Sequence, residues 1–157
     1  METNIGITDA NRQLVAEELN KVLADENVLY TKTKNAHWNL EGVDFYEKHK
    51  FFESQFTQLA DVIDDTAERI RALGHFAVTS LKSTLELTHL TEEKSEDNDS
   101  QGFIKELLSD QESIIIHLRE KIALVGDTYK DLGTADFMTG LMELHEKMAW
   151  FLRSHLK

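Results

Sequence analysis

The feature that most constrains this chain is the absence of proline from all 157 residues. It also has only seven glycines, so few residues in the sequence can stop or kink a helix. Apolar residues recur at three- and four-residue spacing over four long stretches, as in helices that each bury one face. We therefore predict an all-α fold with helices over residues 8–39, 44–73, 100–125 and 134–156.

The predicted helix ends rest on residues that commonly cap or stop a helix. Thr8 or Asp9 can cap the first helix and Asp44 the second, while Gly74 and Gly126 follow the second and third. Short connections after the first and third helices predict antiparallel neighbours. The polar stretch between the second and third helices can hold a short amphipathic helix around residues 81–90, followed by an acidic loop over residues 92–100. We expect one four-helix-bundle domain over residues 1–157, with a short helix in its long middle crossover.

Composition excludes several classes of function. The chain has no cysteine, which rules out disulfides, thiolate metal sites and a cysteine nucleophile. The first residues do not resemble a secretory leader, and no apolar run reaches the length of a membrane span, so we expect a cytoplasmic protein. The net charge of −12 repels nucleic-acid phosphates and anionic lipid but attracts cations.

Two carboxylates of the second predicted helix, Asp64 and Glu68, lie one turn apart and can reach the same cation. On a helical wheel they point away from the predicted core stripe of that helix. This stripe consists of Phe52, Phe56, Leu59, Ile63 and Ile70. The pair also fits a solvated helix face, because Asp61 and Asp65 are close by and Asp65 can pair with Arg69.

Two histidines could supply nitrogen ligands, which together with carboxylates suit Fe(II) or Zn(II). His37 closes the first helix, and His49 lies in the second turn of the next, with Glu53 one turn further on. Antiparallel packing across the short connection brings the two histidines near each other, so they could serve one site. His49 and Asp64 are about 22 Å apart along one helix, because each residue adds about 1.5 Å. Either these groups are unrelated, or a second chain completes the site. Antiparallel pairing about a two-fold axis near residues 56–57 would place His49 of one chain beside Asp64 of the other.

The other histidines have simpler interpretations. His37 taken alone could be a histidine of the helix end or of the core. His145 and His117 lie among apolar residues and are predicted to pack in the core. The segment from Glu86 to His89 matches the Glu-x-x-His motif, but a di-iron bundle needs this motif on two long helices. We therefore assign no metal to it.

The block His37-Trp38-Asn39, followed by His49 and then by Asp64-x-x-x-Glu68-Arg69, resembles the signature of the Dps family (DNA-binding protein from starved cells, or mini-ferritin). The successive gaps of 12, 15 and 4 residues from His37 to Glu68 all match the family. The similarity extends across the chain, through the four long helices and the short crossover helix. The resemblance implies a ferritin-like fold.

The resemblance also implies a dodecameric shell with di-iron sites at its two-fold interfaces. By position, Glu68 would be the main iron-holding carboxylate, His37 and Asp64 would complete the tighter site, and His49 would support a weaker second one. Glu53 stands where the family often has Asp. The implied reaction is a ferroxidase reaction that oxidises Fe(II), preferentially with hydrogen peroxide, stores ferric mineral and protects against oxidative damage.

Four further residues receive roles from the resemblance. Trp38, beside the site, could take up stray oxidising equivalents, or it could simply pack. Asp127, Asp131 and Asp136 stand where the family places acidic three-fold pores for iron entry. Asp131 and Asp136 could instead cap or charge the start of a helix.

The family's other activity, DNA binding, usually depends on a mobile tail rich in Lys and Arg. Residues 1–10 contain neither, and the chain stops at Lys157 without a basic extension. This departure argues against direct DNA binding. The alternatives to an iron-oxidising protein are a nucleoid-binding Dps protein with secondary iron activity and a helical adaptor without metal.

Overall fold

The computed structural model describes residues 3–92 and 99–156, which contain helices and no strand. The predicted all-α class is confirmed, and each predicted boundary lies within two residues of an observed helix end. The elements are α1 (Asp9–Asn39), α2 (Phe45–Ala72), α3 (Leu81–Leu87), α4 (Ser100–Ala123), the π-helical turn η1 (Leu124–Thr128) and α5 (Leu132–Ser154).

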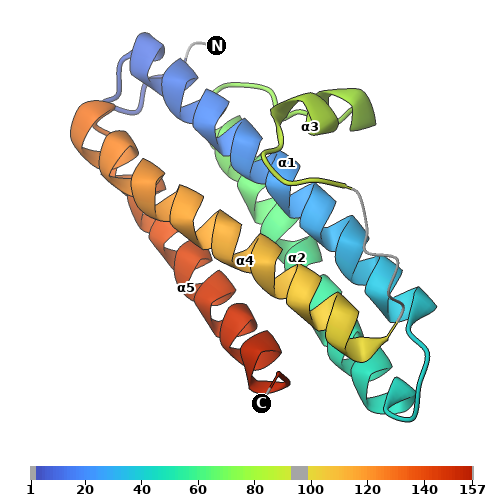
Figure 1. Cartoon of the computed structure of the whole chain (residues 1–157). Coiled ribbons are helices and arrows are strands. Elements are labelled where there is room, and N and C mark those ends of the chain that lie inside the picture. Colours follow the sequence, from blue (N-terminus) through green and yellow to red (C-terminus); the bar gives the residue numbers. More distant parts are fainter. Residues whose placement is uncertain (1–2, 93–98, 157) are drawn as a thin grey trace.

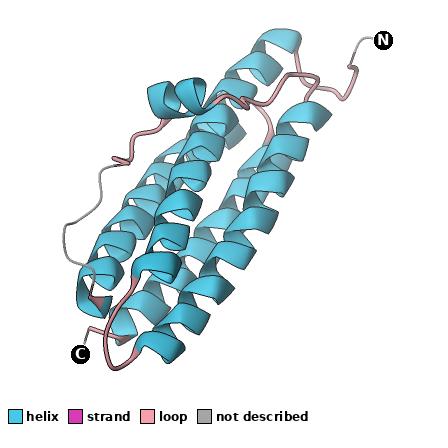
Figure 2. Cartoon of the chain, turned by 90° about the vertical axis from the view of Figure 1, so that its right-hand side faces the viewer, coloured by secondary structure: helices cyan, strands magenta, loops and turns pink. Residues whose placement is uncertain are grey.

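The four long helices form two antiparallel pairs, α1 with α2 and α4 with α5 (Figure 1). Contacts between α1 and α4 join the pairs, and α3 lies against α1 on the side of the bundle (Figure 2). Because α2 and α4 run in the same direction, the crossover that contains α3 spans the length of the bundle. The predicted acidic loop falls mainly on residues 93–98, outside the described residues. In the part of the chain that is described, none of the helices has the length and apolar character needed to cross a bilayer.

The helix ends confirm some predicted caps and correct others. Thr8 caps α1 by accepting a hydrogen bond from the backbone N–H of Asn11 at 3.3 Å. Asp44 stands at the N-cap position of α2, but its side chain makes no capping hydrogen bond. Gly74 ends α2 with a φ of +90°, a conformation that side chains disfavour. Gly126 does not stop a helix: it is buried in η1, where an added Cβ would lie 3.3 Å from Ala135.

The buried stripe of α2 is rotated relative to the predicted one. It consists of Phe52, Gln55, Leu59, Val62, Thr66 and Ile70. Phe56 and Ile63, which the wheel assigned to the core, are only half-buried. The reason is that the polar side chains of Gln55 and Thr66 take inward positions that a purely apolar pattern overlooks. Phe56 instead lies on the flank of α2, against His37.

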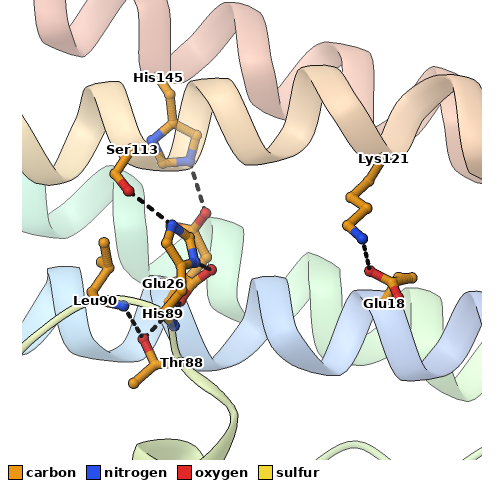
Figure 3. A network of polar contacts seen from close by, with 9 residues as sticks. Glu18, Glu26, Thr88, His89, Leu90, Ser113, Lys121 and His145 are labelled. Atoms are coloured by element: carbon orange, nitrogen blue, oxygen red, sulfur yellow. Dashed lines mark hydrogen bonds and ion pairs between the residues drawn. The ribbon is translucent and has the colours of Figure 1, made fainter.

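The predicted core position of His145 is confirmed, because its side chain is fully buried. Its Nε2 lies 2.8 Å from the carboxylate of Glu26 on α1 (Figure 3). Its Nδ1 lies 2.6 Å from the side-chain oxygen of Gln111 on α4. One histidine of α5 therefore ties three helices together, and both of its ring nitrogens have partners within the chain.

His89 lies just beyond α3 and fastens the crossover to the bundle. Its Nδ1 lies 2.7 Å from the buried carboxylate of Asp25, and its Nε2 lies 2.9 Å from the hydroxyl of Ser113. His117 stacks on this ring at 4.9 Å and is half-buried rather than fully in the core. Burial lowers the pKa of His117, and the neighbouring His89 lowers it further.

Candidate metal centre

His37 and His49 face each other where α1 and α2 connect, as their spacing predicted. Their rings are stacked, with centroids 3.8 Å apart and planes 19° from parallel. The Nδ1 of His37 lies 2.8 Å from the backbone oxygen of His49, and the Nδ1 of His49 lies 2.9 Å from the backbone oxygen of His37. A carbonyl oxygen can only accept a hydrogen bond, so each Nδ1 carries a proton and donates it. The two hydrogen bonds therefore fix the orientation of both rings.

This reciprocal pairing decides which nitrogen each histidine offers. In a neutral imidazole with its proton on Nδ1, Nε2 carries the lone pair that binds metals. Among the described residues, none forms a hydrogen bond or ion pair with Nε2 of either ring. Phe56 packs edge-on against His37, and Phe45 stacks on His49, with ring centroids 5.1 Å apart in both pairs. The geometry thus presents two supported nitrogen ligands side by side.

Asp64 and Glu68 are exposed on α2 and point away from the core of their own chain, as predicted. Within the described chain, neither carboxylate has a hydrogen bond or an ion pair. The pair predicted between Asp65 and Arg69 is absent there too. The guanidinium of Arg69 instead lies 2.9 Å from the hydroxyl of Thr134 on α5. The two carboxylates are thus exposed without local ion pairs, which fits a solvated helix face as well as a site that a second chain completes.

A single chain does not gather these ligands into one site. Within residues 3–92 and 99–156, no three His, Asp or Glu side chains form a group that could hold a metal ion. His49 and Asp64 lie on the same unbroken helix, which keeps them about 22 Å apart. We refer to the pair His37 and His49 as the histidine half-site and to the pair Asp64 and Glu68 as the carboxylate half-site, two candidate parts of one metal centre.

Glu53 and Trp38 lie near the histidine half-site. The carboxylate of Glu53 forms an ion pair with Lys50 at 2.7 Å. The hydrogen bond from Lys50 and the positive charge of its ammonium group lower the pKa of Glu53. Trp38 has 65% of its surface exposed, although it follows His37 directly. The parts of Glu53 in metal binding and of Trp38 in the chemistry stay predictions.

The three candidate pore aspartates differ in their surroundings. Asp131 is buried and caps α5. Its carboxylate accepts a hydrogen bond from the backbone N–H of Thr134 at 2.9 Å. The Thr134 hydroxyl and Arg69 also bind this carboxylate, so capping accounts for Asp131 within its own chain. Asp127 and Asp136 are exposed at the same end of the bundle and stay candidates for a pore.

Two features of the site escaped sequence reasoning. The hydrogen bonds between the histidine rings and backbone carbonyls leave no trace in the sequence, because any residue supplies a carbonyl. The second feature is Lys34, whose ammonium lies 5.0 Å from the centre of the Trp38 ring. Its signal was the spacing of Tyr30, Lys34 and Trp38 on successive turns of one helix face.

Comparisons with known proteins bear on this arrangement. A family model described as a ferritin-like domain matches residues 16–157. "DNA protection during starvation protein 2" of Bacillus anthracis is 34% identical over 146 residues, which cover 93% of this chain and 98% of the relative. The chain belongs to the Dps family of ferritin-like proteins. An uncharacterised low temperature-induced protein of Nostoc sp. is 42% identical over 98% of this chain and 86% of its own length.

The solved Dps structures agree with the fold. The Dps protein of Vibrio cholerae O1 aligns with a TM-score of 0.91 at 30% identity, covering 100% of this chain and 98% of that one. It is described as a member of a broad superfamily of ferritin-like diiron-carboxylate proteins. The resemblance drawn from the histidine and carboxylate spacing is therefore confirmed at the level of the Dps family.

Proposed function

We propose that this Dps chain is an iron-oxidising and iron-storing mini-ferritin whose ferroxidase sites form between two subunits. One observation carries the proposal. His37 and His49 offer two oriented Nε2 atoms, while Asp64 and Glu68 lie unpaired on the outer face of the same α2 helix. Each chain thus has both halves of a site, too far apart to combine with each other.

The donor set fits iron as the substrate. Imidazole nitrogen and carboxylate oxygen together suit Fe(II), whereas Ca²⁺ and Mg²⁺ prefer oxygen alone. The backbone carbonyls that hold Nδ1 of His37 and His49 provide the outer support usual for metal-binding histidines. The description of the V. cholerae Dps protein as a diiron-carboxylate relative also supports iron.

A two-fold contact between α2 helices supplies the missing half of each site. Antiparallel pairing about a point near residues 56–57 brings His49 beside Asp64 of the partner subunit and creates two identical sites in one contact. Half-buried Phe56 and Ile63 lie on the flank of α2 that such a contact would cover. We propose a homo-oligomer, and the family resemblance implies a dodecameric shell.

Two iron ions that react together supply the two electrons that one hydrogen peroxide molecule needs. Two Fe(II) ions give one electron each to hydrogen peroxide, which takes up two protons and leaves as two water molecules. Because both electrons arrive together, no hydroxyl radical is released. Asp64 and Glu68 offset the charge that accumulates as Fe(II) becomes Fe(III), and the ferric product passes to storage. This chemistry would protect a cytoplasm from oxidative damage.

We propose that iron enters past the exposed carboxylates of Asp127 and Asp136, since carboxylates at a narrow opening lower the energy of an entering cation.

The names of several relatives refer to DNA protection. The net charge of −12 per chain disfavours contact with DNA phosphates, so we propose that any such protection operates through iron.

The proposal is tested by mixing the iron-free protein with Fe(II) and hydrogen peroxide and following ferric absorbance. In Asp64→Asn/Glu68→Gln, we expect the initial rate to fall about a hundredfold or more, because the main oxygen ligands are lost. Glu112→Gln/Glu120→Gln removes the same charge from exposed positions of α4 and should oxidise iron like the parent. Parent-like oxidation in the Asp64/Glu68 variant, with shells of normal size, would disprove the ligand assignment.

A further inference from the structure

The ammonium group of Lys34 lies among three aromatic rings at the edge of the histidine half-site. Its Nζ is 5.2 Å from the centre of the Tyr30 ring, 5.0 Å from that of Trp38 and 5.5 Å from that of Phe56. It also lies 3.3 Å from the Tyr30 hydroxyl, to which it donates a hydrogen bond. Tyr30, Lys34 and Trp38 occupy successive turns of α1, and Phe56 reaches them from α2. We call these four residues the lysine cage.

The lysine cage is continuous with the candidate metal centre. Phe56 packs edge-on against the His37 ring at 5.1 Å and against the Tyr30 ring at 6.0 Å. Trp38 directly follows His37, and 65% of its surface is exposed. An oxidant released at the histidines would therefore meet the electron-rich indole of Trp38 among the first groups of the protein.

A cation above an aromatic ring makes that ring harder to oxidise. The ring's negative face attracts the ammonium while the ring is neutral. Loss of one electron turns the ring into a radical cation, so the attraction becomes repulsion between like charges. We propose that Lys34 is a positioning residue that holds the indole of Trp38 and slows its one-electron oxidation. The electrons for peroxide would then come from iron and not from the chain.

The redox step is a one-electron transfer followed by loss of a proton. An oxygen-centred radical takes one electron from the indole and becomes its anion, and the indole radical cation then releases its N–H proton to water. The charge of Lys34 raises the free energy of the first step only. The value of this protection to the shell rests on the proposed iron oxidation, which would bring oxidants close to Trp38. The slower oxidation of Trp38 itself does not require iron.

The chain contains its own reference for this effect. Trp150 is the other of its two tryptophans, and it is 57% exposed, close to the 65% of Trp38. The ring of Trp150 lies against Phe151, at 4.8 Å. Among the described residues, the cations found over aromatic rings are Lys34 and Arg71, and the latter lies over Phe76. Within the described residues, a cation therefore lies over Trp38 and none lies over Trp150, whose neighbour is the Phe151 ring.

The experiment exposes the assembled, iron-free protein to azide radicals, which remove one electron from indole and leave as azide. Peptide mass spectrometry then gives the ratio of oxidised Trp38 to oxidised Trp150. Lys34→Met keeps the length of the side chain and removes its charge, whereas Lys34→Arg keeps the charge. We expect the ratio to rise roughly two- to fivefold in Lys34→Met, as expected for an exposed cation–π contact, and to stay near the parent value in Lys34→Arg.

Acrylamide quenching of tryptophan fluorescence checks that Lys34→Met leaves the access to Trp38 unchanged, and Lys34→Gln serves as a second uncharged variant. An unchanged ratio in both uncharged variants would overturn the proposal. So would an equal rise in Lys34→Arg, because the charge would then not be the cause. Since these measurements contain no iron, a failure of the ferroxidase assignment would appear separately, in the assay with Fe(II).

Discussion

The histidine at the centre of the bundle and the two histidines at the connection between α1 and α2 differ in the partners of their second ring nitrogen. In His145 both nitrogens are bonded within the chain, one to Glu26 and the other to Gln111. In His37 and His49 only Nδ1 is bonded, and to a backbone carbonyl in each case. Both arrangements orient the ring. The first is complete within one chain, whereas the second leaves an Nε2 lone pair that has no partner among the described residues.

The carboxylates that pair with these histidines, or are proposed to share a site with them, also differ in burial. Glu26 is fully buried beside His145, on the inward side of α1. Asp64 and Glu68 are exposed on the outer side of α2. The residue types are the same in both regions, so residue type alone does not separate a structural tie from a ligand. The two roles are separated by the direction in which the helix presents the side chain.

The largest effect on stability should come from His145→Ala. This variant leaves the Glu26 carboxylate buried without its partner, so we expect the free energy of unfolding to fall by about 3–5 kcal/mol. His37→Ala removes one hydrogen bond and the contacts of a ring that is 8% exposed, and it should cost about 1–2 kcal/mol, since no charged group is left buried without a partner. Denaturant unfolding of both variants measures the difference. Equal losses would mean that His37 is also part of the core.

The rate of Fe(II) oxidation should depend more on His37 than on His145, which is the reverse of the order expected for stability. His37→Ala removes a ligand of the tighter iron site and should slow Fe(II) oxidation by about tenfold or more, and His49→Ala should slow it less. His145→Gln can keep one polar contact in the core and should oxidise iron at the parent rate per folded shell. Stopped-flow absorbance with peroxide measures these rates. A slow His145→Gln variant with intact shells would bring the core histidine into the chemistry.

The aspartates of η1 and of the start of α5 also divide into a buried residue, Asp131, and two exposed ones, Asp127 and Asp136. In Asp127→Asn/Asp136→Asn, we expect iron uptake to slow roughly threefold or more, because the exposed charges no longer attract the cation. Asp131→Ala should lower stability by about 1 kcal/mol through loss of a helix cap and leave uptake largely unchanged. Mineralisation assays and thermal unfolding separate the two effects. If the double variant took up iron like the parent, Asp127 and Asp136 would have no pore role.

The smallest expected effect concerns pH and His117. Its pKa in the folded chain is lowered, mainly by burial, so below about pH 6.5 the folded chain binds fewer protons than the unfolded chain. Stability should therefore decrease as the pH falls from about 6.5 toward the lowered pKa. His117→Gln should flatten this decrease in thermal unfolding measured between pH 7 and 5. If the stability of His117→Gln fell just as steeply between pH 7 and 5, groups other than His117 would cause the pH dependence.

The sequence predicted the parts of the molecule that depend on local pattern. The absence of proline and the apolar spacing located every long helix. The four-residue step from Asp64 to Glu68 predicted that both lie on one face of α2, and the helical wheel predicted that this face points away from the core. The short connection after Asn39 was enough to predict that His37 and His49 meet.

Features that depend on distant residues could not be predicted. Arg69 bonds to Thr134, 65 residues away, and not to Asp65 one turn before it. Phe56 and Ile63 looked like core residues, because hydrophobicity alone does not show that Gln55 and Thr66 take the inward positions and leave both side chains half-buried. Gly126 looked like a helix stop, but it lies buried in a π-helical turn, where an added Cβ would be 3.3 Å from Ala135 of the next helix.

The most direct test of shared sites uses mixed shells. One variant lacks the histidine half-site (His37→Ala/His49→Ala), and the other lacks the carboxylate half-site (Asp64→Asn/Glu68→Gln). Each shell alone contains only damaged sites. In a mixed dimer, one of the two interface sites receives no substituted residue, and the other receives all four.

Co-expressed or reassembled mixtures, checked by mass spectrometry for chain exchange, should therefore regain oxidation. With random pairing, mixed dimers are half of the total and keep one intact site of two, so the expected rate is roughly a quarter of the parent rate. A site built within one chain would show no recovery, because every chain carries a defect. Verified mixed shells that stay as inactive as either variant would contradict the shared site.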